Sequence, residues 1–112
     1  MKNIDNFSFG DIVIASMPFS DGTSEKIRPV LILAKDREDY LFLKITTQIQ
    51  KSEPFDIVLS PDSENHLKSI SLIKTKKIST YTKEILHQKV GTLSDEDKQK
   101  VKANLISFLS QL

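Results

Sequence analysis

The chain has 112 residues, of which 38% are hydrophobic and 28% are charged, and its formal net charge is +1 at pH 7. This length favours one domain over residues 1–112 with its own hydrophobic core. No segment approaches the roughly 18 to 20 apolar residues of a membrane span, and the first residues lack the apolar stretch of a secretory signal, so we expect a cytoplasmic protein with no membrane partner. The chain has no Cys and only two His, far apart in sequence, which predicts no disulfide, no metal site and no cofactor.

The near-zero net charge conceals an uneven distribution along the chain. Residues 1–25 are mainly acidic, whereas residues 66–90 carry six lysines against one carboxylate, Glu84. A local excess of Lys attracts the phosphates of nucleic acid. A solvated charged face without any ligand explains the same excess equally well, so both interpretations stay open.

The first half of the chain predicts three strands. Ile12–Met17 is rich in β-branched residues and is stopped by Pro18. Residues 20–26 are dense in turn formers and polar groups, which predicts a solvent-facing loop before a second strand over residues 29–34. A charged turn follows, and residues 40–46 predict a third strand that pairs antiparallel with the second as a hairpin.

The second half predicts further short strands and one helix. Residues 55–59 alternate as a strand does, and residues 77–80 and 88–91 are weaker strand candidates. Ser94 precedes three acidic residues, which is typical of a helix N-terminus. Apolar residues follow at helical spacing: Val101, Leu105, Ile106, Phe108, Leu109 and Leu112. Together these elements predict a mainly β fold, a small SH3-like antiparallel barrel, with a C-terminal helix packed against it.

Arg28 stands at the entrance to the second predicted strand, directly before Pro29 and behind the polar loop. A guanidinium anchored at the mouth of a strand can bind phosphate through two parallel hydrogen bonds. If the third strand pairs alongside, the hydroxyls of Thr46 and Thr47 face the same anion. An ordinary arginine in a surface ion pair explains Arg28 equally well on spacing alone.

Aromatic and histidine side chains have simpler interpretations. Tyr40, Phe42 and Phe55 lie within strand patterns, which favours a place in the core over stacking on nucleic-acid bases. His66 and His87 lie in polar stretches, which is typical of exposed histidines without a catalytic role.

Several motifs occur in a fixed order along the chain: Gly10-Asp11-Ile12-Val13, the polar loop, Arg28-Pro29-Val30-Leu31-Ile32-Leu33, Ile45-Thr46-Thr47-Gln48 and Val90-Gly91-Thr92-Leu93-Ser94. This ordered set resembles the MazF/PemK-type toxins over nearly the whole chain, and the joint pattern is much more specific than any single motif. The resemblance implies the toxin half of a type II toxin–antitoxin pair, built as an SH3-like barrel that forms a homodimer, with a cognate antitoxin protein as partner.

The resemblance also implies an activity. Members of the family are endoribonucleases that cut single-stranded RNA at short sequences, and their catalytic arginine and threonine or serine fall on Arg28 and Thr46. RNA supplies its own nucleophile, the 2′-hydroxyl, so the enzyme needs only to position and stabilise an in-line attack that gives a 2′,3′-cyclic phosphate and a 5′-hydroxyl. We therefore expect a sequence-specific, metal-independent endoribonuclease.

Other residues near these motifs are candidates for the same site. Arginine holds its proton at any ordinary pH and so cannot act as the general base, and neither His lies near the motifs. Glu25, a carboxylate of the polar loop, is the candidate for that role. Candidates for catalysis or RNA contact are Glu25, Thr47 and Gln48, and candidates for RNA binding are Ser24, Lys26, Lys76 and Lys77. The chain departs from the family's commonest form at Lys26-Ile27, where many members carry a glycine-histidine pair, and at Lys44, where a proline often stands. The target sequence is therefore not transferable.

Two other classes of function remain open at this point. One is a catalytically weak relative that binds RNA or a protein without cleavage, and the other is an SH3-like interaction module unrelated to RNA. Arg28 and Thr46 separate the endoribonuclease from both, because neither alternative requires the two residues. An adjacent reading frame for a small antitoxin favours the endoribonuclease.

Overall fold

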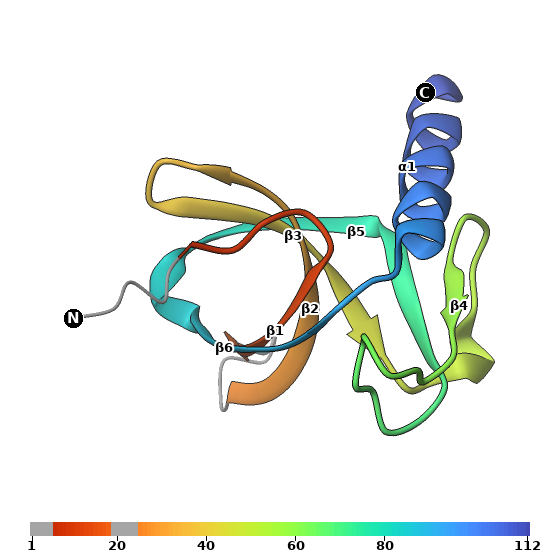
Figure 1. Ribbon diagram of the computed structural model, residues 1–112. Coiled ribbons are helices and arrows are strands. Elements are labelled where there is room, and N and C mark those ends of the chain that lie inside the picture. Colours follow the sequence, from red (N-terminus) through yellow and green to blue (C-terminus); the bar gives the residue numbers. More distant parts are fainter. Residues whose placement is uncertain (1–5, 19–24) are drawn as a thin grey trace.

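The structure is a computed structural model that describes residues 6–18 and 25–112. Six strands form one antiparallel sheet in the order β4-β5-β3-β2-β1-β6, followed by a single long helix (Figure 1). The elements in chain order are β1 (Asp11–Pro18), β2 (Glu25–Asp36), β3 (Asp39–Thr46), η1 (Ile49–Lys51), β4 (Ile57–Leu59), β5 (Ser71–Thr82), η2 (Lys83–Ile85), β6 (Leu86–Thr92) and α1 (Asp95–Ser110). The prediction of a mainly β fold with a C-terminal helix is confirmed. No helix in the described part of the chain is long and apolar enough to cross a membrane.

The sheet is buried on both faces, because successive side chains of a strand point to opposite sides and both sets are apolar in its central strands. One cluster consists of Val13, Ala15, Met17, Val30, Ile32, Tyr40, Phe42 and Leu86. The other consists of Ile12, Leu31, Leu43, Ile45, Ile57, Leu59, Ile73, Leu93 and Val101. The uninterrupted apolar run at the centre of β2 therefore contributes side chains to both clusters. The prediction that Tyr40 and Phe42 are core residues is confirmed.

Helix α1 begins as the sequence predicts and closes over the second cluster. The Ser94 side chain accepts a hydrogen bond from the backbone N–H of Asp97 at 3.1 Å, which satisfies one of the free donors of the first turn. Further along, Asn104 Nδ2 donates to the backbone carbonyl of Phe55 at 2.9 Å, and the rings of Phe55 and Phe108 lie 5.7 Å apart. The helix thus holds the segment between β3 and β4.

Two strands are longer than the sequence pattern predicts. Strand β2 begins at Glu25, so Lys26 lies in the strand and the predicted loop does not extend that far. Strand β5 begins at Ser71, six residues before the predicted start at residue 77. Its first residues are buried, and they include the polar Lys74 and Thr75. Polarity at buried positions hid this half of the strand.

Strand β4 is shorter than predicted and starts at Ile57, after Phe55 adopts a positive φ of 74° that a strand does not allow. The pairing of β3 with β5 also contains an irregularity, because Leu43 faces Ile78 whereas Ile45 faces Ile73. Three extra residues of β5 are accommodated across from this short stretch of β3. Such bulges bend a sheet and redirect its side chains.

Candidate functional site

A cleft of about 400 Å³ lies at the start of β2 and the end of β3, next to the core cluster that contains Val30. Its floor is apolar and its rim is polar. Among the described residues it is lined by Met17, Pro29, Val30 and Ile45 and by Arg28, Lys44, Thr46, Gln48, Lys51, Glu53, Lys74 and Lys77. Five of these side chains are cationic and one is a carboxylate, so the cleft favours a polyanionic ligand.

The register of the sheet brings Arg28 and Thr46 together. Val30 of β2 pairs with Lys44 of β3, and the same register extended by two residues places Arg28 opposite Thr46. Residues two apart on a strand share a face. Arg28 therefore continues the row of Val30 and Ile32, while Lys44 and Thr46 continue the row of Phe42. Arg28 and Thr46 are each half-buried, and both line the cleft.

The hydroxyl of Thr46 has a defined orientation. Its Oγ1 accepts a hydrogen bond from the backbone N–H of Gln48 at 3.1 Å, a local turn contact that Thr often makes. Because the oxygen is used as an acceptor on that side, its own hydrogen is directed elsewhere and is available to donate. Thr47 is exposed and does not line the cleft, so the structure brings only one of the two predicted hydroxyls into the site.

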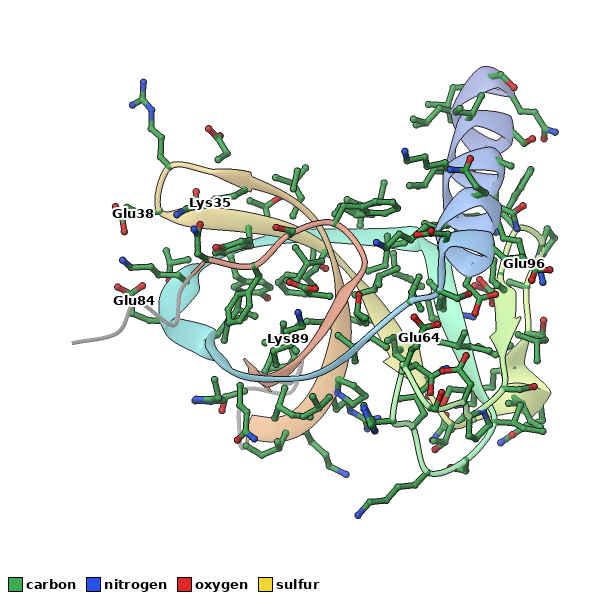
Figure 2. All side chains as sticks on the ribbon, in the orientation of Figure 1. Lys35, Glu38, Glu64, Glu84, Lys89 and Glu96 are labelled. Carbon is green, nitrogen blue, oxygen red and sulfur yellow. The ribbon has the colours of Figure 1, made fainter. Side chains whose placement is uncertain are left out.

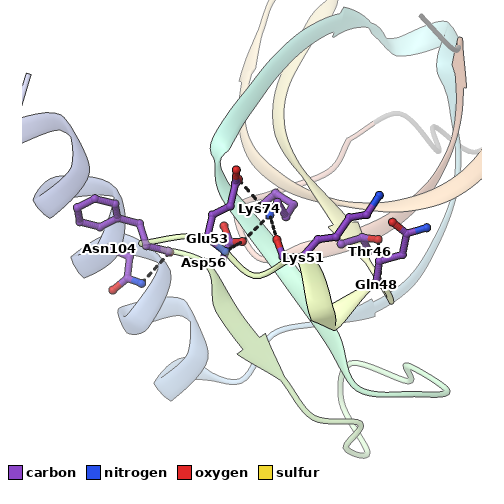
Figure 3. Close-up of polar contacts among 8 residues, drawn as sticks. Thr46, Gln48, Lys51, Glu53, Asp56, Lys74 and Asn104 are labelled. Atoms are coloured by element: carbon purple, nitrogen blue, oxygen red, sulfur yellow. Dashed lines mark hydrogen bonds and ion pairs between the residues drawn. The ribbon is translucent and has the colours of Figure 1, made fainter. Parts of the chain in front are cut away.

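The outer wall of the cleft is held by an ion-pair network centred on Lys74, whose side chain is 11% exposed. Figure 3 shows its ammonium bound to the segment that follows β3. Lys74 Nζ lies 2.5 Å from Asp56 Oδ2, 3.2 Å from Glu53 Oε1 and 3.1 Å from the backbone carbonyl of Lys51. Asp56 Oδ2 also accepts from the backbone N–H of Glu53 at 2.9 Å.

The pKa of Lys74 reflects this environment. Desolvation by burial acts to lower the pKa, but the hydrogen bonds to Asp56 and Glu53 and the charges of both carboxylates outweigh it, so the pKa is raised above its ordinary value of 10.5. Lys74 therefore remains an ammonium that is already satisfied by the protein.

Three other lysines of the cleft are in a different situation. Lys44, Lys51 and Lys77 are exposed, and none of them forms an ion pair with another described residue. Lys74 and Lys77 line the same cleft although residues three apart in a regular strand point to opposite faces. The irregularity in the pairing of β5 with β3 explains how both reach it.

The predicted site residues divide into several groups. Arg28, Thr46, Gln48 and Lys77 line the cleft, whereas Lys26, Lys76 and Thr47 do not. Ser24 and the side chain of Glu25 lie outside the described residues. Sequence reasoning missed Lys44, Lys51, Glu53 and Lys74. The alternation of Phe42, Lys44 and Thr46 on one strand was a signal for Lys44, but no pattern marked the buried Lys74.

Comparison with known families defines the class of protein. Residues 8–109 match the model of the "PemK-like, MazF-like toxin of type II toxin-antitoxin system" family. The chain therefore belongs to the PemK/MazF-like toxin family, and the resemblance seen in the sequence is confirmed. A comparison with curated protein sequences gave no significant match.

Solved structures agree on the fold. An endoribonuclease in complex with its cognate antitoxin, from a mycobacterial species, is similar with a TM-score of 0.74 and 17% identity over 94% of this chain and 96% of that chain. MazF from Deinococcus radiodurans has a TM-score of 0.71 and 15% identity over 97% and 99% of the two chains. The Mycobacterium tuberculosis toxin MazF-mt6 has a TM-score of 0.68 and 17% identity over 88% and 96%.

Proposed function

We propose that this chain is an endoribonuclease toxin that cuts single-stranded RNA at a short sequence without a metal ion. The observation that carries the proposal is that Arg28 of β2 and Thr46 of β3 line the same cleft, whose rim is cationic. Membership of the PemK/MazF-like toxin family and the likeness to structures described as endoribonucleases support it.

The chemistry follows from the RNA and the two side chains. The 2′-oxygen attacks the adjacent phosphorus while the bond from phosphorus to the 5′-oxygen breaks, which gives a 2′,3′-cyclic phosphate and a 5′-hydroxyl. The guanidinium of Arg28 stabilises the negative charge that grows on the phosphoryl oxygens. The Thr46 hydroxyl, oriented by Gln48, donates to a non-bridging oxygen. Glu25 stays the candidate to receive the proton of the 2′-hydroxyl.

The cationic rim would hold the RNA strand on either side of the reacting phosphate. Lys44, Lys51 and Lys77 are exposed and unpaired among the described residues, so each is available for a phosphate. Lys74 is excluded from this role because Asp56 and Glu53 already neutralise it. Of the predicted RNA-binding lysines Lys26, Lys76 and Lys77, Lys77 lines the cleft, and we add Lys44 and Lys51 to the proposed set.

A cognate antitoxin is the second proposed partner. One of the similar structures is an endoribonuclease bound to its cognate antitoxin. A protein that occupies a cleft of this kind would exclude RNA, and an acidic segment would match the lysines of the rim. We also propose that the chain acts as a homodimer in the cytoplasm, as the family resemblance implies.

The test is incubation of the purified protein with a long single-stranded RNA in EDTA, beside Arg28→Ala and Arg37→Ala. Arg37 is the matched control, because it is an exposed arginine in the turn between β2 and β3, at the opposite end of these strands from the cleft. We expect cutting at one short motif by the wild type and by Arg37→Ala, with cyclic phosphate ends, and none by Arg28→Ala.

Two results would contradict the proposal in different ways. Intact RNA in every lane removes the nuclease and favours a relative that binds RNA or a protein without cleavage. Cutting that survives in Arg28→Ala removes Arg28 from the mechanism. Circular dichroism of both variants should match the wild type, since Arg28 lies at the rim of the cleft outside both core clusters.

A further inference from the structure

The cleft contains one acidic side chain among its described residues, that of Glu53. A carboxylate is a poor neighbour for RNA phosphates, because like charges repel. One of its oxygens faces Lys74, and the accessible part of the carboxylate suits a ligand group other than phosphate. The groups of RNA that a carboxylate binds well are hydrogen-bond donors on the bases and the 2′-hydroxyls.

Glu53 is held in place and is still accessible. Its Oε1 lies 3.2 Å from the ammonium of Lys74, which in turn is fixed by Asp56, a residue whose side chain is only 1% exposed. The Glu53 side chain is 45% exposed, so its carboxylate is open to a ligand in the cleft. An acceptor that is fixed before binding loses little conformational entropy when a ligand arrives.

The position of Glu53 argues against a role at the reacting phosphate. In Figure 3, Glu53 and Thr46 lie on opposite sides of Lys51, well separated from one another. A general base must lie within hydrogen-bond reach of the proton that it removes. Glu53 is therefore placed to meet a nucleotide next to the one whose phosphate reacts at Arg28 and Thr46.

We propose that Glu53 is a specificity-determining residue, which accepts a hydrogen bond from the exocyclic amino group of a base in the RNA strand. Carboxylates accept from N4 of cytosine in nucleic-acid recognition. Uracil presents a carbonyl oxygen at the same position, which the carboxylate repels, and the same contrast holds between adenine and hypoxanthine. This inference rests on the proposed function and names one determinant of its target sequence.

The experiment measures binding without cleavage. Short 2′-O-methyl oligonucleotides, which lack the nucleophile, are compared as two amino-to-carbonyl pairs: oligo(C) with oligo(U), and oligo(A) with oligo(I). Fluorescence anisotropy gives their affinities for the wild type, for Glu53→Gln and for Glu38→Gln. Glu38 is the matched control, because it is a glutamate in the turn between β2 and β3 that does not line the cleft (Figure 2).

We expect the wild type and Glu38→Gln to favour the amino member of at least one pair by about tenfold. In Glu53→Gln this ratio should fall toward one, because the amide can accept from an amino group and donate to a carbonyl. The cleavage motif of the wild type should contain a position restricted to amino-bearing bases, and Glu53→Gln should relax that position alone.

Each contrary outcome is decisive. An equal preference in Glu53→Gln and the wild type, or no amino preference in the wild type, overturns the role of Glu53 and leaves the nuclease proposal standing. An amino preference that depends on Glu53 in a protein that cuts no RNA supports the inference and overturns only the nuclease. Failure of the wild type to bind any of the oligonucleotides overturns the role of Glu53, whereas cutting of the long RNA decides the nuclease separately.

Discussion

The two walls of the cleft use their charges in opposite ways. On the outer wall, the ammonium of Lys74 is surrounded by Glu53, Asp56 and a backbone carbonyl, so that its charge is satisfied within the protein. On the inner wall, Lys44 has no ion-pair partner among the described residues and stands on the same face of β3 as the hydroxyl of Thr46, where the cleft opens to solvent. The lysine of the outer wall is neutralised by the protein's own carboxylates, and the lysine of the inner wall is left for a ligand.

A lysine in a cationic cleft is therefore not by itself a phosphate ligand. Lys74 and Lys77 lie three residues apart on β5 and line the same cleft, yet only Lys74 has carboxylate partners among the described residues. Removal of Lys74 should therefore lower stability, whereas removal of Lys77 should lower affinity for RNA.

The largest expected effect is on stability, in Lys74→Met. Removal of one partner of a buried ion pair leaves the other charge uncompensated and typically costs about 3–5 kcal/mol. Asp56 is left buried, and its Oδ1 already has no hydrogen-bond partner in the described part of the chain. Urea denaturation measures the loss, and Lys77→Met should stay within about 0.5 kcal/mol of the wild type. Equal stability of the two variants would contradict the contrast between the lysines.

The contribution of Lys74 should also depend on pH in a defined direction. Its folded-state pKa is raised above the ordinary value of 10.5, so its stabilising contribution is complete below pH 10.5 and is lost as pH rises through the folded-state value. The difference in unfolding free energy between wild type and Lys74→Met should be constant from neutral pH to pH 10.5 and shrink above it. A difference that grows over this alkaline range would refute the ion-pair explanation.

On the inner wall, Thr46→Ala should reduce the cleavage rate and leave stability nearly unchanged. The loss of one hydrogen-bond donor to the transition state typically costs about 10²-fold in rate. Thr47→Ala is the matched control, since Thr47 is exposed and lies outside the cleft, and it should cut RNA at the wild-type rate. If Thr47→Ala were the slower enzyme, the catalytic hydroxyl would belong to Thr47.

The strands of the core, the start of α1 and the β2–β3 hairpin could be predicted from the sequence. Alternating apolar residues predicted the strands that form the core, and Ser94 with its acidic neighbours predicted the start of α1. The hairpin of β2 and β3 was predicted as well, and hence the approach of Arg28 and Thr46. These features depend on local propensity and on a register that a short turn sets.

The outer wall of the cleft could not be predicted from the sequence, because it depends on contacts between distant parts of the chain. Lys74 was one lysine in a basic stretch, and nothing local shows that Glu53 and Asp56, some twenty residues earlier, neutralise it. Lys76 and Lys77 were equivalent in sequence, and only the irregular pairing of β5 decides which of them reaches the cleft. Polarity and charge predict exposure, whereas burial with a partner is a tertiary property.

The smallest expected effect distinguishes those two neighbours. Each phosphate contact to single-stranded RNA contributes about 0.7 to the slope of log affinity against log salt. Lys77→Gln should therefore lower the magnitude of that slope by about 0.7 for an uncleavable RNA, while Lys76→Gln leaves it unchanged, because Lys76 does not line the cleft. Equal slopes for the two variants would mean that the basic stretch attracts RNA as a diffuse field, and that the bulge in β5 has no part in placing the strand.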